Sequence, residues 1–135
     1  MTIAVVTDPA RFDYDRVVPF IQASYWGAGR SAADIRRAFQ GSAVVGVFEG
    51  GVQLGMARAI TDGVFHAYIY DLFVFEEARG RGLAHVLMQA LFDHPQLRGV
   101  RGWMLSTRDA HGLYEKYGFQ PVDPGRVMWL RRSAG

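Results

Sequence analysis

The sequence predicts an α+β fold in which helices flank a twisted, mixed and mostly antiparallel sheet. Three strand-like segments follow one another between residues 43 and 75, and the chain then alternates between helical and strand-like periodicity. Half of the 135 residues are hydrophobic, and no repeat or linker interrupts them, so we expect a single domain over residues 1–135. In order, the predicted elements are strand 2–6, helix 13–22, helix 31–39, strands 43–48, 52–60 and 64–75, helix 82–93, strand 100–107, helix 110–117, and strands 119–122 and 126–130.

Caps and turn residues justify the boundaries in the first part of the chain. Pro19 falls inside the first helical segment and is expected to delay its start. Ser31 is a favoured N-cap for the second helix. Gly50-Gly51 suits a tight hairpin turn, and Asp62-Gly63 serves in the same way before the third strand of the run. His94-Pro95 ends the long helix.

The last part of the chain is expected to complete the sheet. Residues 110–117 form a short amphipathic helix, for which Gly118 is the expected C-cap. Two strands around Asp123-Pro124-Gly125 would follow, and they offer one route to a homodimer.

Composition excludes several classes of protein. The chain has no cysteine, so disulfides and thiolate chemistry are excluded. Its net charge of +2 is too small to indicate nucleic-acid binding, and no apolar span suggests a membrane segment, so a cytoplasmic protein is expected. The four histidines lack metal-ligand spacing, and no metal is expected.

The segment Arg79-Gly80-Arg81-Gly82 lies between a strand-like run and a helix. This order brings free backbone N–H groups and the positive end of the helix dipole to one point. The glycines let the backbone approach a phosphate, and the arginines add charge. The third glycine of a dinucleotide fingerprint and the Gly-Lys-Ser/Thr of a nucleotide-triphosphate loop are both missing. A different phosphate-bearing ligand is therefore expected.

Two motifs resemble those of one superfamily. The spacing Arg79-x-x-Gly82-x-Ala84 resembles the pyrophosphate loop of the GNAT superfamily of acetyl-CoA-dependent N-acyltransferases. Asp109-x-x-x-x-Tyr114, followed by Tyr117-Gly118-Phe119, is similar to the late motif of that superfamily. The resemblance covers residues 42–131. More narrowly, the segments 24–26, 61–62 and 107–111 are similar to a small bacterial subgroup without an assigned substrate.

The resemblance implies acetyl-CoA as cosubstrate. Pantetheine would lie beside the strand at residues 68–75, which splays from its neighbour, usually at a bulge. Backbone groups of Phe73 and Val74 would face it, and the N–H near Val74 would stabilise the oxyanion. Asp109 would either cap its helix or bind the cofactor. The implied pyrophosphate residues are Arg79, Gly80, Arg81, Gly82, Leu83 and Ala84.

The implied catalytic acid is Tyr114, which matches the tyrosine that protonates the CoA thiolate in the superfamily. No base is obvious, because Tyr68 and Tyr70 occupy the positions where relatives carry Glu or His. Asp71 is the first choice, although strand alternation puts it opposite Tyr70 unless a bulge redirects it. Proton loss through ordered water is the alternative. Other carboxylates and imidazoles within reach are Glu76, Asp62, His66 and His111.

The acceptor should bind opposite the cofactor, where aromatic side chains suit an amine through cation–π contact and Arg58 suits a carboxylate. A small-molecule amine or peptide acceptor is therefore expected. The predicted lining is Tyr25, Trp26, Arg58, Phe65, Tyr68 and Tyr70.

Together these features predict an N-acetyltransferase that moves the acetyl group of acetyl-CoA to a primary amine by direct attack in a ternary complex. Two enzymatic alternatives are a different acyl-CoA donor and an O-linked acceptor. A third alternative, from another class, is a non-catalytic acyl-CoA-binding or regulatory module, since fold alone does not imply turnover.

Overall fold

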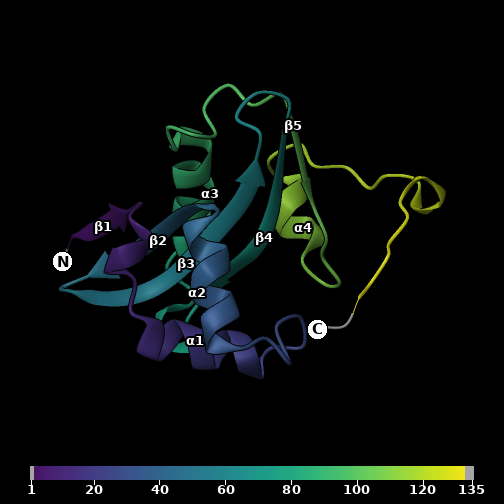
Figure 1. The fold of residues 1–135 in the computed structure, drawn as a ribbon. Helices are drawn as coiled ribbons and strands as arrows, with labels where there is room; N and C mark the ends of the chain where they lie inside the picture. The colour runs from purple at the N-terminus through teal and green to yellow at the C-terminus, as the bar shows by residue number, and fades with distance from the viewer. Residues whose placement is uncertain (1, 133–135) are drawn as a thin grey trace.

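A five-stranded sheet forms the centre of the fold in a computed structural model that describes residues 2–132 (Figure 1). The strand order follows the chain, from β1 at one edge to β5 at the other. The first four strands pair antiparallel, and β4 pairs with β5 in parallel, which confirms the mixed and mostly antiparallel sheet. The strands are β1 (Ile3–Val6), β2 (Ala43–Glu49), β3 (Val52–Thr61), β4 (His66–Val74) and β5 (Gly102–Leu105).

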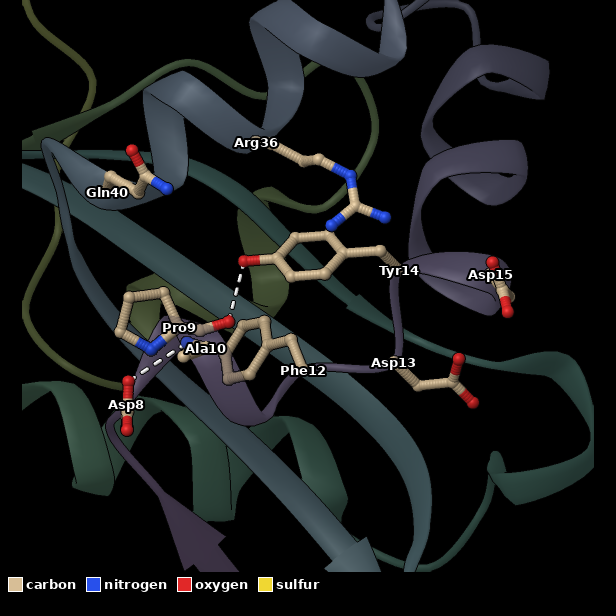
Figure 2. Close-up of a pocket in the computed structure, with 9 residues that line it drawn as sticks. All are labelled: Asp8, Pro9, Ala10, Phe12, Asp13, Tyr14, Asp15, Arg36 and Gln40. Carbon is tan, nitrogen blue, oxygen red and sulfur yellow. Dashed lines mark hydrogen bonds between the residues drawn. The ribbon is translucent and has the colours of Figure 1, made fainter.

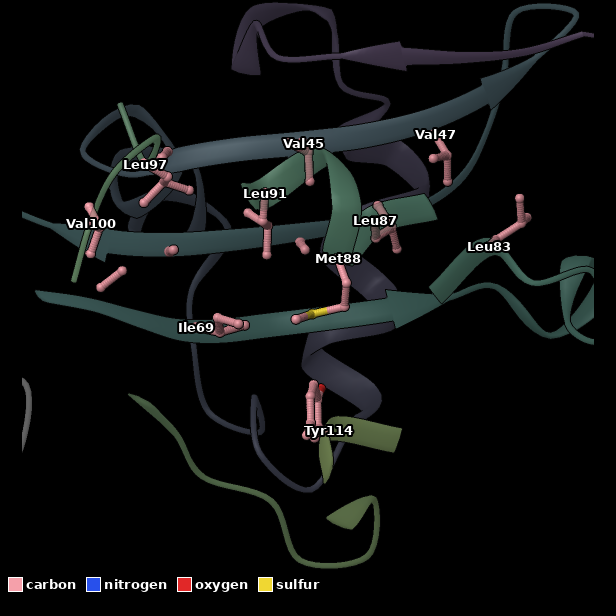
Figure 3. Packing of buried hydrophobic residues seen from close by; sticks show 14 of the residues in the cluster. Val45, Val47, Ile69, Leu83, Leu87, Met88, Leu91, Leu97, Val100 and Tyr114 are labelled. Atoms are coloured by element: carbon pink, nitrogen blue, oxygen red, sulfur yellow. The ribbon is translucent and has the colours of Figure 1, made fainter. Parts of the chain in front are cut away.

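Helices cover both faces of the sheet. One face packs against α1 (Tyr14–Ala23) and α2 (Ala32–Gln40), and the other packs against α3 (Leu83–Asp93). The α3 side is the larger apolar cluster, in which Leu87, Met88 and Leu91 are fully buried against the strands (Figure 3). No helix among residues 2–132 has the length and apolar character needed to span a bilayer. The short helices are η1 (Pro9–Arg11), η2 (Glu76–Ala78), α4 (His111–Glu115) and η3 (Pro124–Arg126).

The predicted turn residues act as expected. Gly50 and Gly51 both have positive φ, at 58° and 82°, and they close the hairpin between β2 and β3. Asp62 organises the next turn, because its carboxylate accepts hydrogen bonds from the backbone N–H groups of Val64, Phe65 and His66. The sequence therefore predicts these connections correctly.

One extra residue in β4 changes which way its side chains point. Ala57 pairs with Leu72 but Ala59 pairs with Ile69, so Arg58 alone faces both Tyr70 and Asp71. This bulge shifts the alternation of the strand by one residue. Ile69 and Leu72 therefore pack on the α3 side, although an uninterrupted strand would place them on opposite faces.

The pairing between β4 and β5 stops while β4 continues. The last paired residues are Ile69 and Leu105, and β4 runs on to Val74 without β5 beside it. The bulge lies directly after the last pair. The splayed strand pair expected from the sequence is therefore present.

Two sequence-based expectations are wrong. Pro19 lies inside α1, which already begins at Tyr14, because Val17 and Ile21 are fully buried and hold the helix on the sheet. The strands expected at residues 119–122 and 126–130 do not form. The segment instead leaves the body of the protein (Figure 1). Apolar residues make a strand only where they pair with a sheet edge, and in residues 2–132 this segment borders β5 without pairing with it.

Candidate active site

A cavity of about 350 Å³ lies between the end of β4 and the start of α3. Both elements converge there because β4 leads through η2 directly into the glycine-rich turn. Seven of the ten residues that the sequence assigns to the cofactor line this cavity. The lining residues are Leu72, Phe73, Val74, Ala78, Arg79, Gly80, Gly82, Leu83 and Ala84.

The two glycines of the turn give it its shape. Gly80 and Gly82 have φ of 80° and 73°, in the left-handed region that favours glycine. A Cβ atom on either glycine would meet nothing within 4 Å, so the turn borders open space. Gly82 is the N-cap of α3 and supplies no side-chain cap, which leaves the first N–H groups of the helix for a ligand. These features fit an anion such as a pyrophosphate.

The two arginines of the turn have different partners. Arg79 donates from Nε to the carbonyl oxygen of Val74 at 3.2 Å, which ties the turn back to β4. Arg81 forms a bidentate pair with Glu49, at 2.7 and 3.2 Å. This pair lowers the pKa of the Glu49 carboxyl and raises the pKa of Arg81. Sequence reasoning missed Glu49, because it lies 32 residues away and only the fold brings it to the loop.

The backbone of β4 faces the gap, while the Phe73 side chain turns away from it. The Phe73 ring is 7% exposed and stacks on Phe20 with ring centroids 4.3 Å apart. It also lies against Phe75 and Trp26 in the α1 and α2 cluster. Phe73 and Val74 can therefore meet a ligand in the gap mainly through backbone groups.

Tyr114 lies on α4 and lines a groove together with Trp103, Met104 and Leu105 of β5. Its side chain is 9% exposed and belongs to the α3-side cluster (Figure 3). Burial raises the pKa of the Tyr114 phenol, and the neighbouring Tyr25 raises it further, so the hydroxyl stays protonated at neutral pH. Arg108 places its guanidinium 3.7 Å from the centroid of the Tyr25 ring.

Asp109 does not cap α4. It is exposed, and the first N–H of this turn, that of Ala110, is bound by the Thr107 hydroxyl at 3.0 Å. This corrects one of the two roles that the sequence allowed for Asp109. Gly118 does act at the helix end, with φ of 93° and its N–H bound to the Glu115 carbonyl at 3.0 Å.

Asp71 sits in a buried ion cluster. Its side chain is 1% exposed and accepts from Arg58 Nε at 2.5 Å and from Arg30 Nη1 at 3.1 Å. Arg58 also donates to the Ser42 hydroxyl at 3.0 Å and lies 4.9 Å from the Tyr70 ring centroid. Both oxygens of Asp71 are thus occupied by guanidinium groups. This arrangement favours a structural role for Asp71 and Arg58 over the roles of base and carboxylate ligand expected from the sequence.

The bulge explains how this cluster forms. It places Asp71 on the same face as Tyr70, next to Arg58, instead of on the α3 side. Arg30 enters from the loop between α1 and α2 and was not singled out by the sequence. No local sequence pattern links Arg30 to Asp71, because 41 residues separate the two in the chain.

The predicted acceptor residues are partly exposed, with Tyr25 57% and Tyr70 41% exposed. Tyr68 and Tyr70 have ring centroids 4.6 Å apart, and the Tyr68 hydroxyl lies 2.7 Å from the Ser106 hydroxyl. Guanidinium groups already lie over Tyr25, Trp26 and Tyr70. Phe65 stands apart in the turn between β3 and β4 and is 62% exposed.

A second cavity, of about 570 Å³, lies between η1, α1 and α2 (Figure 2). Its groups stabilise the N-terminal turn. The Tyr14 hydroxyl donates to the Pro9 carbonyl at 2.6 Å, and Arg36 lies over the Tyr14 ring. Asp8 binds the N–H of Ala10. This cavity shares no residue with the glycine-rich turn. Among residues 2–132, no group of three or more His, Cys, Asp or Glu side chains is placed to hold a metal ion.

Comparison with known proteins gives a consistent result. Residues 13–119 match the Acetyltransferase (GNAT) family. A candidate acetyltransferase of Gibberella zeae is 31% identical over 136 residues, which covers 83% of this chain and 75% of that protein. Serotonin N-acetyltransferase 2 of Oryza sativa is 30% identical over 107 residues, but only 53% of its length is covered.

The structural comparison agrees. The crystal structure of a candidate GNAT acetyltransferase from Xanthomonas campestris superposes with a TM-score of 0.90 at 36% identity, over 98% of this chain and 94% of that one. The match over residues 13–119 and the splayed strands leading into the glycine-rich turn point the same way. The chain belongs to the GNAT family of acetyltransferases.

Proposed function

We propose that the chain is a single-domain N-acetyltransferase that transfers the acetyl group of acetyl-CoA to a primary amine of a small molecule or peptide. One observation carries the proposal. Beyond Ile69 the edge of β4 has no strand partner in the described residues, and the end of the strand lines the cavity of the glycine-rich turn. The free edge suits an extended thiol arm, and the turn suits a phosphate.

The turn would hold the pyrophosphate. Free N–H groups at the start of α3 supply hydrogen bonds, and the left-handed glycines keep the surface open. Arg81 would contribute charge after exchanging Glu49 for phosphate, since both are anions that accept a bidentate pair. The pantetheine arm would pair with the free backbone of β4 beyond Ile69, as an added strand does.

Tyr114 would act as the acid of the reaction. The amine nitrogen bonds to the acetyl carbon, the carbon–sulfur bond breaks, and the departing thiolate takes the phenol proton. The raised pKa of Tyr114 keeps that proton in place until charge develops on sulfur. A backbone N–H near Val74 would stabilise the oxygen that becomes negative.

The proton of the attacking ammonium would leave through water. Asp71 is buried and paired with two arginines, so it is poorly placed to accept a proton. The Asp62 carboxylate accepts hydrogen bonds from three backbone N–H groups of its own turn, and these bonds lower its pKa. We therefore assign Asp71 to positioning. It links β4 to Arg58 on β3 and to Arg30 in the loop after α1.

The test is release of thiol from acetyl-CoA, followed with a colorimetric disulfide reagent across polyamines, amino acids, arylamines and peptide N-termini. The chain contains no cysteine, so every thiol detected comes from CoA. We expect release that depends on the amine, together with an acetylated product seen by mass spectrometry. The amine that supports release identifies the acceptor class.

Two results would count against the proposal. Saturable acetyl-CoA binding without release by any amine would favour a binding or regulatory module. Release with a longer acyl-CoA but not with acetyl-CoA would assign a different donor. The direct-attack order is checked separately, because a ternary complex gives intersecting double-reciprocal plots when both substrates are varied.

A further inference from the structure

Two loops from distant parts of the chain meet through one arginine and one tyrosine. The first loop, residues 24–31, joins α1 to α2, and the second, residues 106–110, joins β5 to α4 (Figure 1). Arg108 of the second loop places its guanidinium 3.7 Å from the ring centroid of Tyr25 in the first. This contact spans the side of the sheet on which α1 and α2 pack.

The second loop is fixed to the face of β4 that carries the tyrosines. Its Ser106 hydroxyl lies 2.7 Å from the Tyr68 hydroxyl, at hydrogen-bond distance. Ala67 and Ile69 pack on the α3 side, so Tyr68 between them points to the opposite face. The predicted acceptor surface of β4 therefore lies directly beside the loop that carries Arg108.

The arginines of this region outnumber the carboxylates that pair with them. Arg30 and Arg58 share the single carboxylate of Asp71. Arg108 is exposed, and within residues 2–132 its guanidinium forms no ion pair, although Asp109 follows it in the chain. The acceptor side of β4 therefore carries a surplus of positive charge, and Arg108 is the arginine of this group that has no carboxylate partner among the described residues.

Tyr25 holds the guanidinium of Arg108 and leaves its hydrogen-bond donors available. A guanidinium that lies against an aromatic ring can still direct its fork of N–H groups at a carboxylate. Tyr25 is 57% exposed, so a ligand in solvent can reach this contact. Tyr25 is also near enough to Tyr114 to raise the pKa of its phenol. Arg108 thus lies in the neighbourhood of the proposed acid.

We propose that Arg108 binds a carboxylate of the acceptor, so that the substrates are amino acids or other small amines with a carboxylate near the reacting nitrogen. This assignment rests on the acetyl transfer proposed above. It moves the carboxylate contact from Arg58, which Asp71 already occupies, to the second loop. The surplus of positive charge would also lower the pKa of a bound ammonium, which helps the acceptor to lose its proton to water.

The test compares each amino acid with its carboxamide, by thiol release from acetyl-CoA. Because the carboxamide also changes the pKa of the amine, the informative quantity is the acid-to-amide ratio of kcat/KM, compared between proteins. Arg108→Ala should lower this ratio at least tenfold, mainly through a higher KM for the acid, since a charge-assisted bidentate contact is lost. Arg108→Lys should restore part of the ratio, because it keeps the charge without the fork.

A matched control is available in Arg101→Ala. Arg101 is also exposed and lies 5.2 Å from the ring centroid of the exposed Phe65, in the turn between β3 and β4 and the start of β5. This variant should keep the wild-type ratio. Tyr25→Phe should keep it as well, whereas Tyr25→Leu should lower it, because the ring positions Arg108. Far-UV circular dichroism checks that every variant keeps the fold.

Three results would overturn the carboxylate assignment while leaving acetyl transfer intact. Equal losses for acids and amides in Arg108→Ala would show a structural role. Weaker acetyl-CoA binding by calorimetry, with an unchanged ratio, would assign Arg108 to the cofactor. Faster turnover of amides in the variant would show that Arg108 only covers the entrance. If the wild type releases thiol with neither acids nor amides, acetyl transfer itself is wrong, and the carboxylate assignment is wrong with it.

Discussion

Arg58 and Asp71 face each other across the bulge of β4, with Nε 2.5 Å from Oδ2 and both side chains buried. A charge removed from water in this way is stable only while its partner is present. The pair therefore joins the register of the sheet to the loop after α1, which Arg30 anchors to the same carboxylate.

Asp71→Asn should destabilise the protein by about 3 kcal/mol, because loss of one member leaves a buried charge without its partner. Urea unfolding followed by tryptophan fluorescence measures the change. Asp109→Asn is the matched control, since Asp109 is exposed, and it should cost less than about 0.5 kcal/mol. If Asp71→Asn unfolds like the wild type but has no turnover, Asp71 is the base and its assignment to positioning is wrong.

Gly82→Ala should weaken acetyl-CoA binding at least tenfold, measured by calorimetry. Gly82 has φ of 73°, and an alanine there strains the turn that holds the N–H groups of α3. Gly99→Ala provides the control, because Gly99 has φ of 80°, and a Cβ there also meets open space. Both variants should lose about 1 kcal/mol of stability. Equal affinity in the two variants would place the pyrophosphate elsewhere.

Glu49→Gln should strengthen acetyl-CoA binding about two- to fivefold at low salt, since Arg81 would no longer have a competing carboxylate. The pKa of Glu49 is held below its ordinary value, so the pair persists above that value and weakens only as the pH falls through the lowered one. The gain should therefore be the same at pH 6 and pH 8. Weaker binding in the variant would show instead that Glu49 orients Arg81 for the ligand.

Tyr114→Phe should lower kcat about 100-fold or more while leaving acetyl-CoA affinity unchanged, because the variant keeps the ring but has no proton to give. The pKa of Tyr114 is raised above the ordinary phenol value, so the phenol is predominantly protonated at both pH 7 and pH 9. The loss should thus be equal at both pH values. Tyr117→Phe removes a hydroxyl that bonds to His85 and should keep kcat. An unchanged kcat in Tyr114→Phe would exclude the acid role.

The cofactor cavity is the part of the site that the sequence describes best. Gly80, Gly82 and the helix that follows are contiguous in the chain, so strand, turn and helix order suffices to predict their geometry. The partners of the arginines could not be predicted in this way. Glu49 and Arg30 come from distant segments, and no local pattern links them to Arg81 or Asp71.

The failed strands at the end of the chain have a related cause. The apolar run from Val127 to Leu130 is a genuine strand signal, but it does not specify an edge for that strand. A bulge in this strand was expected, but its position could not be predicted, for a different reason. Leu72, Phe73 and Val74 are all apolar, so either phase of the alternation fits the pattern.

The bulge also means that the separation of β4 from β5 depends on the number of residues in β4. Removing either Tyr70 or Asp71 would restore an even ladder between β3 and β4. Phe73 and Phe75 would keep their present faces, because the residues on both sides of the bulge already pair in register with β3, and the strand would stay flush with β5 instead of parting from it. Conservative substitutions in this strand would leave the opening in place, whereas a deletion of one codon would close it.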